Sequence, residues 1–296
     1  MSLQQAASVT QAAIAFANLW THWLNPPGGL AYVAPGGGVG AAARGMSRKA
    51  MMRTAITQFT GFLPPLALSF PNLGQDLLGG LNWTNWTLQI NNAFFLRDSI
   101  TYSDFLELCR TAYHESRHGE QVYRAAQGLA ALAFPFPDTS QATVIQAASS
   151  GARGVAARVA AFSGQGLQQP AVRVQLITNL LKIPSNVAQH AETNRLQFAT
   201  FVALPKPVWF KRQTATLEVQ EWMRSLAKQS LNGMTMWVEQ NAGEGRRAYA
   251  MYRDLPVELD AHAIEDSVAT ALETRIGRTE AVDGNRQRTD TARFGA

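Results

Sequence analysis

The segment from Thr101 to about Ala133 constrains the fold of this chain more than any other. Thr101 is a favoured N-cap residue, and Asp104 follows three residues later, so we expect a helix to begin here. The prolines of Phe134–Pro137 cannot continue a helix and predict its end. The sequence therefore predicts one long, uninterrupted helix in this region.

Within this helix, His114, Glu115 and His118 form the pattern His-Glu-x-x-His. Four residues are about one helical turn, so both imidazoles project from the same face and can bind one metal ion. Glu115 lies beside them, where a carboxylate can act on a metal-bound water. With five histidines in 296 residues, chance would produce this pattern only roughly 0.004 times per chain. We therefore predict a zinc site with His114 and His118 as ligands.

A catalytic zinc normally has three protein ligands and an open fourth position, so another ligand must come from elsewhere in the chain. The segment 252–262 offers Glu258, which is followed by Leu259, Asp260 and Ala261. Here the chain resembles the gluzincin metallopeptidases, in which a second helix supplies a zinc-binding glutamate through a Glu-x-x-Ala/Ser-Asp type of motif. The resemblance implies that Glu258 is the third zinc ligand.

The resemblance covers about residues 101–128 and 252–269 and not the stretch between them. It also departs from the family at His262, which stands where the family has an aspartate that steadies a zinc-bound histidine. We expect either that His262 acts through another contact or that Glu265 replaces Glu258 as the ligand. The sequence leaves both alternatives open.

The resemblance implies a hydrolytic mechanism. Zinc lowers the pKa of its bound water towards about 7 and polarises the scissile carbonyl, while Glu115 moves the proton of the water to the leaving amine. A donor must also stabilise the oxyanion, and His262, Tyr252 and Tyr113 are the candidates. Arg117 is expected to point away from the metal, because its charge would weaken zinc binding.

Hydrophobic periodicity and helix-breaking residues predict a mainly α fold with a small β element (α+β). The resemblance to gluzincins implies that this is a zincin-like metallopeptidase fold with an active-site helix. The Trp, Thr, Ile and Phe residues of segment 83–96 predict a strand. Its part from Leu88 to Phe95 lies where zincins place the edge strand that pairs with an extended substrate. Further helices are expected over residues 2–24, 170–202, 214–240 and 256–276.

The expected domain organisation has three parts. Residues 1–45 form an N-terminal helix and a Gly-rich loop, and residues 46–276 form the metallopeptidase domain. That domain contains a helical insertion over about residues 133–250. Residues 277–296 have little apolar content and are expected to form a disordered tail.

Composition narrows the choice of partners and compartment. A net charge of +5 and a pI near 9.6 would suit an anionic partner, but the basic residues are scattered, so no nucleic-acid partner is expected. The single cysteine, Cys109, permits no intramolecular disulfide and is expected to be a small buried residue. No signal peptide or transmembrane segment is recognised, so we expect a cytoplasmic chain as synthesised, with any secretion using no cleavable signal.

These features predict a zinc-dependent peptidase (hydrolase) acting on a peptide or protein. The run His114–Gln121 is also similar to zincin domains of bacterial toxins and secretion-system effectors, which implies a carrier or secretion-machinery partner and an inhibitor. The alternative is a catalytically inactive zincin-like module that binds a carrier protein or a membrane. An intact Glu115 favours the active enzyme.

Overall fold

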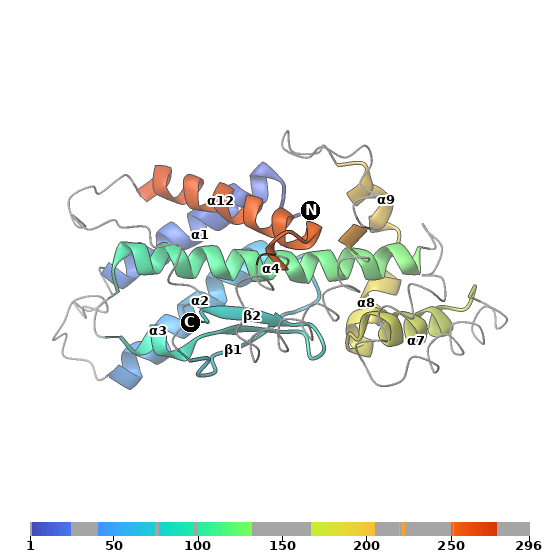
Figure 1. Cartoon of the computed structure of the whole chain (residues 1–296), viewed down its shortest axis with the longest axis horizontal. Coiled ribbons are helices and arrows are strands. Elements are labelled where there is room, and N and C mark those ends of the chain that lie inside the picture. Colours follow the sequence, from blue (N-terminus) through green and yellow to red (C-terminus); the bar gives the residue numbers. More distant parts are fainter. Residues whose placement is uncertain are drawn as a thin grey trace. The chain divides into compact units, whose positions relative to one another are not determined.

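The structure, a computed structural model, describes residues 2–24, 41–74, 77–97, 100–131, 167–204 and 252–276, together with residues 219, 221, 222 and 250. This part of the chain is mainly helical and contains one small sheet (Figure 1). The predicted mainly α fold with a small β element is confirmed. The helices are α1 (Ala6–Leu24), α2 (Ala41–Thr60), α3 (Asn92–Leu96), α4 (Tyr102–Ala130), α7 (Pro170–Leu181), α8 (Ser185–Thr193), α9 (Gln197–Val202) and α12 (Pro256–Ile276).

The two helices that carry the predicted site form where the sequence places them. At the start of α4, the Asp104 backbone N–H donates to Thr101 Oγ1 over 3.1 Å, and the Thr101 N–H donates to Asp104 Oδ2 over 3.4 Å. This reciprocal pair is the expected capping box. The helix α12 begins at Pro256, a residue suited to the first turn because it lacks an N–H.

Other predicted segments fall partly outside the described residues. The helices α1, α7, α8 and α9 lie within the expected ranges 2–24 and 170–202. The predicted helix over 214–240 lies almost wholly outside the part of the chain that the structure describes, and so does the C-terminal tail from residue 277. The predicted loop over 26–45 is undescribed up to residue 40, and the prediction is wrong for residues 41–45, which form the first turn of α2.

The sheet has three strands in the order β1-β3-β2: β1 (Ala67–Ser69), β3 (Thr87–Ile90) and β2 (Gly79–Asn82). The central strand β3 pairs in parallel with β1 and antiparallel with β2. The prediction that Leu88–Phe95 forms an edge strand is wrong, since β3 is paired on both sides. The edge strands are instead β1 and β2.

The last part of the predicted strand, Asn92–Leu96, is the helix α3. Asn91 explains the change, because its side-chain oxygen accepts a hydrogen bond from the Ala93 N–H over 3.0 Å and caps the helix. The Asn91 amide nitrogen also donates to the carbonyls of Gly74 and Leu77. Local capping therefore outweighs the β propensity of the two phenylalanines that follow.

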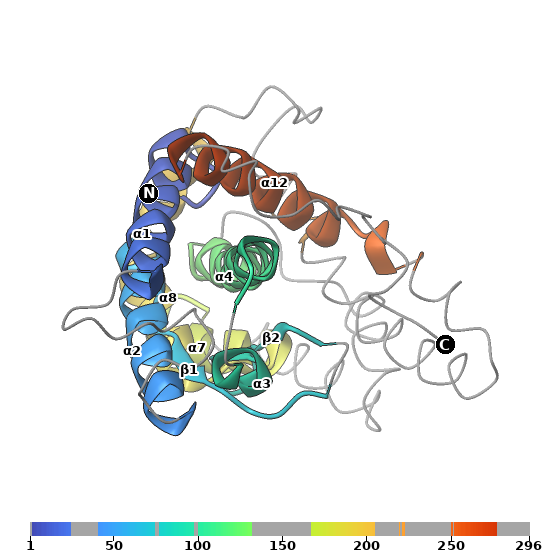
Figure 2. The ribbon, with the colours of Figure 1, turned by 90° about the vertical axis from the view of Figure 1, so that its left-hand side faces the viewer.

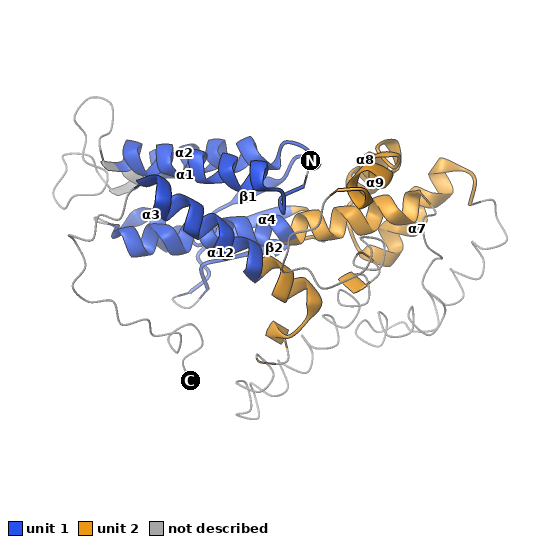
Figure 3. Ribbon diagram, turned by 90° about the horizontal axis from the view of Figure 1, so that it is seen from above, with its two compact units in different colours: residues 1–82, 87–117, 262–296 blue, residues 83–86, 118–261 orange. Residues whose placement is uncertain are grey.

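The chain divides into two compact units (Figure 3). Unit 1 contains residues 1–82, 87–117 and 262–296, and unit 2 contains residues 83–86 and 118–261. The helices α4 and α12 each contribute residues to both units. In this division the N-terminal helix α1 belongs to the same unit as the first half of α4. The expected domain boundary at residue 45 stays a prediction.

Within unit 1, the first half of α4 lies between α12 and the sheet, with α1 and α2 along one side (Figure 2). Aromatic residues join these layers: Trp20 and Trp23 of α1 both pack against Phe105 of α4, with ring centroids 4.8 and 5.2 Å apart. Burial of these tryptophans assigns α1 to the core. Cys109 is also fully buried, as expected, and burial raises the pKa of its thiol well above the usual value.

No helix in the described part of the chain combines the length and the apolar character needed to cross a lipid bilayer.

Candidate metal centre

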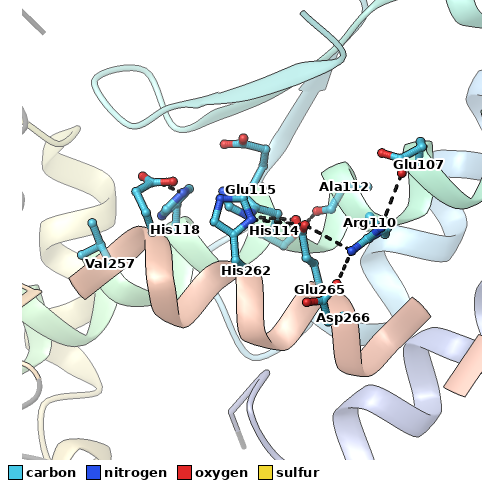
Figure 4. A network of polar contacts seen from close by, with 12 residues as sticks. Glu107, Arg110, Ala112, His114, Glu115, His118, Val257, His262, Glu265 and Asp266 are labelled. Atoms are coloured by element: carbon cyan, nitrogen blue, oxygen red, sulfur yellow. Dashed lines mark hydrogen bonds and ion pairs between the residues drawn. The ribbon is translucent and has the colours of Figure 1, made fainter. Parts of the chain in front are cut away.

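The helix α4 holds His114, Glu115 and His118 near its middle, so their backbone positions are fixed by regular helical hydrogen bonding. His114 and His118 lie one turn apart and are almost fully buried, with 8% and 6% of their surface exposed. Figure 4 shows the side chains of His114, His118 and His262 gathered between α4 and α12. The central motif of the sequence therefore lies in the interior.

Glu258, the expected third ligand, lies in the first turn of α12 and is 1% exposed. Its Oε1 atom is 3.3 Å from His118 Nε2. His114, His118 and Glu258 each offer one ligand atom, and these atoms lie within 4.8 Å of one another. The structure thus brings together the three residues that sequence reasoning named as metal ligands.

His114, His262 and Glu265 form a second group of metal-ligand type, which shares His114 with the first. The two carboxylate oxygens of Glu265 each face an imidazole: Oε2 is 3.0 Å from His114 Nδ1, and Oε1 is 3.2 Å from His262 Nδ1. Arg110 adds a positive charge 3.8 Å from Oε1 and also pairs with Asp266 (Figure 4).

These contacts determine the charge of Glu265. Burial on its own would raise the pKa of this carboxyl group, but hydrogen bonds and charge interactions with His114 and His262 outweigh burial and bring the pKa well below its usual range. Glu265 is therefore an ionised carboxylate that can orient both imidazoles. A carboxylate that accepts from the far nitrogen of a metal-binding histidine is a common supporting contact in zinc sites.

Glu115 points away from the histidines towards the sheet (Figure 4). Its Oε2 atom accepts a hydrogen bond from the backbone N–H of Leu81 on the edge strand β2, over 2.8 Å. Gly79 lets the strand approach this closely, because a Cβ atom there would lie 2.9 Å from Thr111 Cγ2 of α4 and 2.8 Å from the Gln89 carbonyl oxygen. The expected general base is thus held by a strand that the sequence did not predict.

The residues that precede the two histidines have partners on another side of α4. The Tyr113 hydroxyl donates to the Leu3 carbonyl over 2.7 Å, and Tyr113 is fully buried. This removes Tyr113 from the candidate oxyanion donors. The Arg117 guanidinium donates to Gln4 Oε1 over 2.9 Å and Ser2 Oγ over 3.3 Å, so it faces the N-terminal segment. The sequence predicted only that Arg117 points away from the metal.

The other residues that the sequence named as candidates differ in whether they lie at the site. His262 is partly exposed and its ring centroid lies 4.6 Å from that of His114, so it belongs to the site. Tyr252 is partly exposed and is helical, a few residues before α12 begins, and its role as a donor stays a prediction. His190 instead contacts Tyr123 over 2.8 Å.

Sequence reasoning missed two buried or half-buried residues of the site, Gln121 and Arg110. Gln121 contacts His118, and Arg110 contacts Glu265. Their spacing from the histidines, three residues after His118 and four before His114, places each on the same helical face. That spacing was the available signal, but nothing in the sequence identifies their partners on α12.

Comparison with models of protein families, with curated proteins and with solved structures found no match to this chain.

Proposed function

We propose that this chain is a zinc-dependent peptidase with a zincin-like arrangement, in which His114, His118 and Glu258 hold the metal. The observation that supports this most is the buried group of two imidazoles and one carboxylate, with ligand atoms within 4.8 Å of one another. Two histidines and a glutamate are one of the ligand sets of catalytic zinc, which leaves a fourth position open.

The spacing of one pair of ligand atoms fits zinc. In a tetrahedral site with bonds of about 2.0–2.2 Å, neighbouring ligand atoms lie about 3.3–3.6 Å apart. His118 Nε2 and Glu258 Oε1 are 3.3 Å apart, which is long for a hydrogen bond between a buried histidine and a carboxylate. The same spacing suits two ligands of one ion.

Glu258 is a better third ligand than Glu265. Both oxygens of Glu265 already face imidazole Nδ1 atoms, so this carboxylate suits an orienting role towards His114 and His262. Glu258 instead faces His118 through its Nε2 atom. Glu265 then takes the place of the gluzincin aspartate one helical turn further along α12.

Zinc, when bound, supplies a Lewis acid that makes water nucleophilic near neutral pH and polarises a carbonyl group. We assign to Glu115, the neighbour of His114 in the sequence, the role of accepting the proton of the attacking water and passing it to the leaving amine, for which its carboxylate would turn from the Leu81 N–H towards the histidines. His262 directs Nδ1 towards the Glu265 carboxylate, so its Nε2 atom is the ring nitrogen left to face a substrate oxyanion, and it donates there when the ring is protonated. Tyr252 is the second candidate for that role.

The substrate class that follows is a peptide or protein. The similarity of His114–Gln121 to domains of bacterial toxins and effectors supports a secreted role, with a carrier or secretion-machinery partner and a dedicated inhibitor. Delivery without a cleavable signal peptide belongs to the same proposal.

The test is the variant Glu115→Gln, compared with wild type on a peptide library. We expect the variant to keep its fold and its zinc and to lose hydrolysis, because the amide cannot accept the proton. Glu107→Gln, the same substitution two turns earlier on α4, is the matched control and should retain activity.

Hydrolysis that survives Glu115→Gln would contradict the assignment of the base. A wild-type protein that binds zinc but cleaves nothing in the library would instead favour the alternative, a zincin-like binding or delivery module.

A further inference from the structure

Gln121 is fully buried one turn beyond His118 and contacts three groups at once. Its side-chain oxygen lies 2.8 Å from His118 Nδ1. Its amide nitrogen donates to the Val257 carbonyl over 2.9 Å and to Asp260 Oδ2 over 2.7 Å. One amide group thus joins a predicted metal-binding histidine to two residues of α12.

These contacts fix the orientation of the amide. A backbone carbonyl and an ionised carboxylate can only accept hydrogen bonds, so the Gln121 nitrogen must face Val257 and Asp260. The oxygen of the amide is then the atom that faces His118, and it can only accept. His118 must therefore carry its hydrogen on Nδ1, and a neutral imidazole in this form has its lone pair on Nε2.

This choice of tautomer determines what His118 offers to its surroundings. His118 Nε2 lies 3.3 Å from Glu258 Oε1, and both side chains are buried. When the ring is neutral, two lone pairs that face each other in a buried position repel unless a proton or a metal cation lies between them. The contact with Gln121 thus presents His118 as a ligand to a cation shared with Glu258.

The same amide also positions Glu258. Val257 precedes Glu258 directly and Asp260 follows it by two residues, so both hydrogen bonds hold the first turn of α12 around the carboxylate ligand. The charge of Asp260 further polarises the amide, which makes its oxygen a stronger acceptor towards His118. Gln121 therefore acts on two of the three proposed ligands.

We infer that Gln121 is a positioning residue of the metal centre, which fixes the tautomer of His118 and the location of Glu258 without touching the metal. The inference rests on the zinc site proposed above. In this arrangement Asp260 holds the Gln121 amide in place. His118 then has an amide as its supporting partner, whereas His114 has the carboxylate of Glu265.

The first measurement is the affinity of the full chain for Zn²⁺ in competition with a chelator, together with the visible spectrum of the Co²⁺-loaded protein. Loss of a supporting partner of a metal ligand typically weakens metal affinity by about 10- to 100-fold. We expect a loss of this size and a changed cobalt spectrum in Gln121→Leu.

Gln127→Leu is the matched control, because Gln127 is equally buried on the same helix but contacts Tyr123 and the Asn194 carbonyl. Its zinc affinity and cobalt spectrum should equal those of wild type. If Gln121 served only to stabilise the fold, Gln121→Leu and Gln127→Leu would change the zinc affinity and the cobalt spectrum to the same extent.

A second set of variants keeps the shape of the side chains. Gln121→Glu places a carboxylate against that of Asp260 and should weaken zinc binding, because the two charges repel. Adding Asp260→Asn restores a hydrogen bond between the two positions, because the new amide at position 260 can donate to the new carboxylate at position 121. That carboxylate can still accept from His118 Nδ1. We expect the double variant to bind zinc more tightly than Gln121→Glu alone.

The outcomes separate this inference from the proposed function. Wild-type protein that binds neither Zn²⁺ nor Co²⁺ would overturn both. Wild-type protein that binds zinc, with equal affinity and an unchanged cobalt spectrum in Gln121→Leu, would overturn the positioning role and leave the metal centre intact. If Gln121→Leu does not fold, the zinc affinities of Gln121→Glu, Asp260→Asn and the double variant provide the test. A double variant whose loss of zinc affinity equals the sum of the two single losses would contradict the inference.

Discussion

At the scale of single residues, the site depends on how each imidazole is held. His114 faces the carboxylate of Glu265, and His118 faces the amide of Gln121. A carboxylate partner raises the basicity of an imidazole more than a neutral amide does, so the two proposed ligands differ in donor strength. The Glu265 charge is in turn held by His262 and Arg110.

His190 gives a residue-scale prediction for pH. Tyr123 accepts from Gln127 Nε2 and can therefore donate its hydroxyl proton to His190 Nδ1, which requires that this nitrogen be unprotonated. Burial lowers the pKa of His190 below its usual value, so the folded state favours the neutral ring. The resulting stability is present above the unfolded pKa of about 6.5 and is lost as the pH falls towards the folded pKa.

We therefore expect the free energy of unfolding to fall less between pH 7.5 and pH 5.5 in His190→Gln than in wild type. Urea denaturation at the two pH values measures it, and the difference between the two proteins removes the contributions of the other histidines. An identical fall in both proteins would show that His190 does not titrate in this way.

The site could be predicted residue by residue only where one helix carries the pattern. His114, Glu115 and His118 follow from helical spacing, and Glu258 followed from a resemblance in a second segment. The partners Gln121, Arg110 and Leu81 could not be predicted, because their contacts depend on the pairing of α4 with α12 or with β2. Pairing between distant segments leaves no periodic signal in a single sequence.

At the scale of elements, capping residues and prolines explain why the main helices were predictable. Thr101 and Asp104 mark the start of α4, and Pro256 marks the start of α12. The strands β1 and β2 could not be predicted, because they have only three and four residues and β2 contains two glycines. Short strands of this kind are set by their pairing with β3, not by their own composition.

The helices α7 and α8 are joined by a buried ion pair between Arg173 and Glu192, with Arg173 Nε and Glu192 Oε2 2.9 Å apart. These residues are only 5% and 2% exposed. We expect Glu192→Ala to destabilise the folded protein by about 3–5 kcal/mol, because it leaves a buried guanidinium without its carboxylate partner.

Arg97→Ala is the matched comparison, since Arg97 pairs with Asp104 over 3.0 Å but both side chains are exposed. Its loss should cost no more than about 1 kcal/mol. Denaturant unfolding followed by circular dichroism compares the two variants. Equal effects would show that burial does not determine the contribution of the α7–α8 pair.

At the scale of the whole molecule, the proposed centre depends on long-range contacts along the sequence. His118 and Glu258 are separated by 140 positions, yet they lie 3.3 Å apart in one buried group. Buried carboxylates and imidazoles are costly to desolvate, so a chain retains such a group where pairing or a metal ion compensates. A bound metal would also stabilise the folded chain, because binding occurs only in the folded state.

The most direct test of the central claim is the zinc content of the purified full-length protein, measured by elemental analysis after dialysis against trace zinc. We expect one zinc ion per chain in wild type and in the control Glu107→Gln, and none in His118→Ala or Glu258→Ala. Glu265→Gln should retain zinc with affinity lowered by about 10- to 100-fold. A folded wild-type protein that holds no zinc, or a Glu258→Ala variant that holds it as tightly as wild type, would contradict the proposed centre.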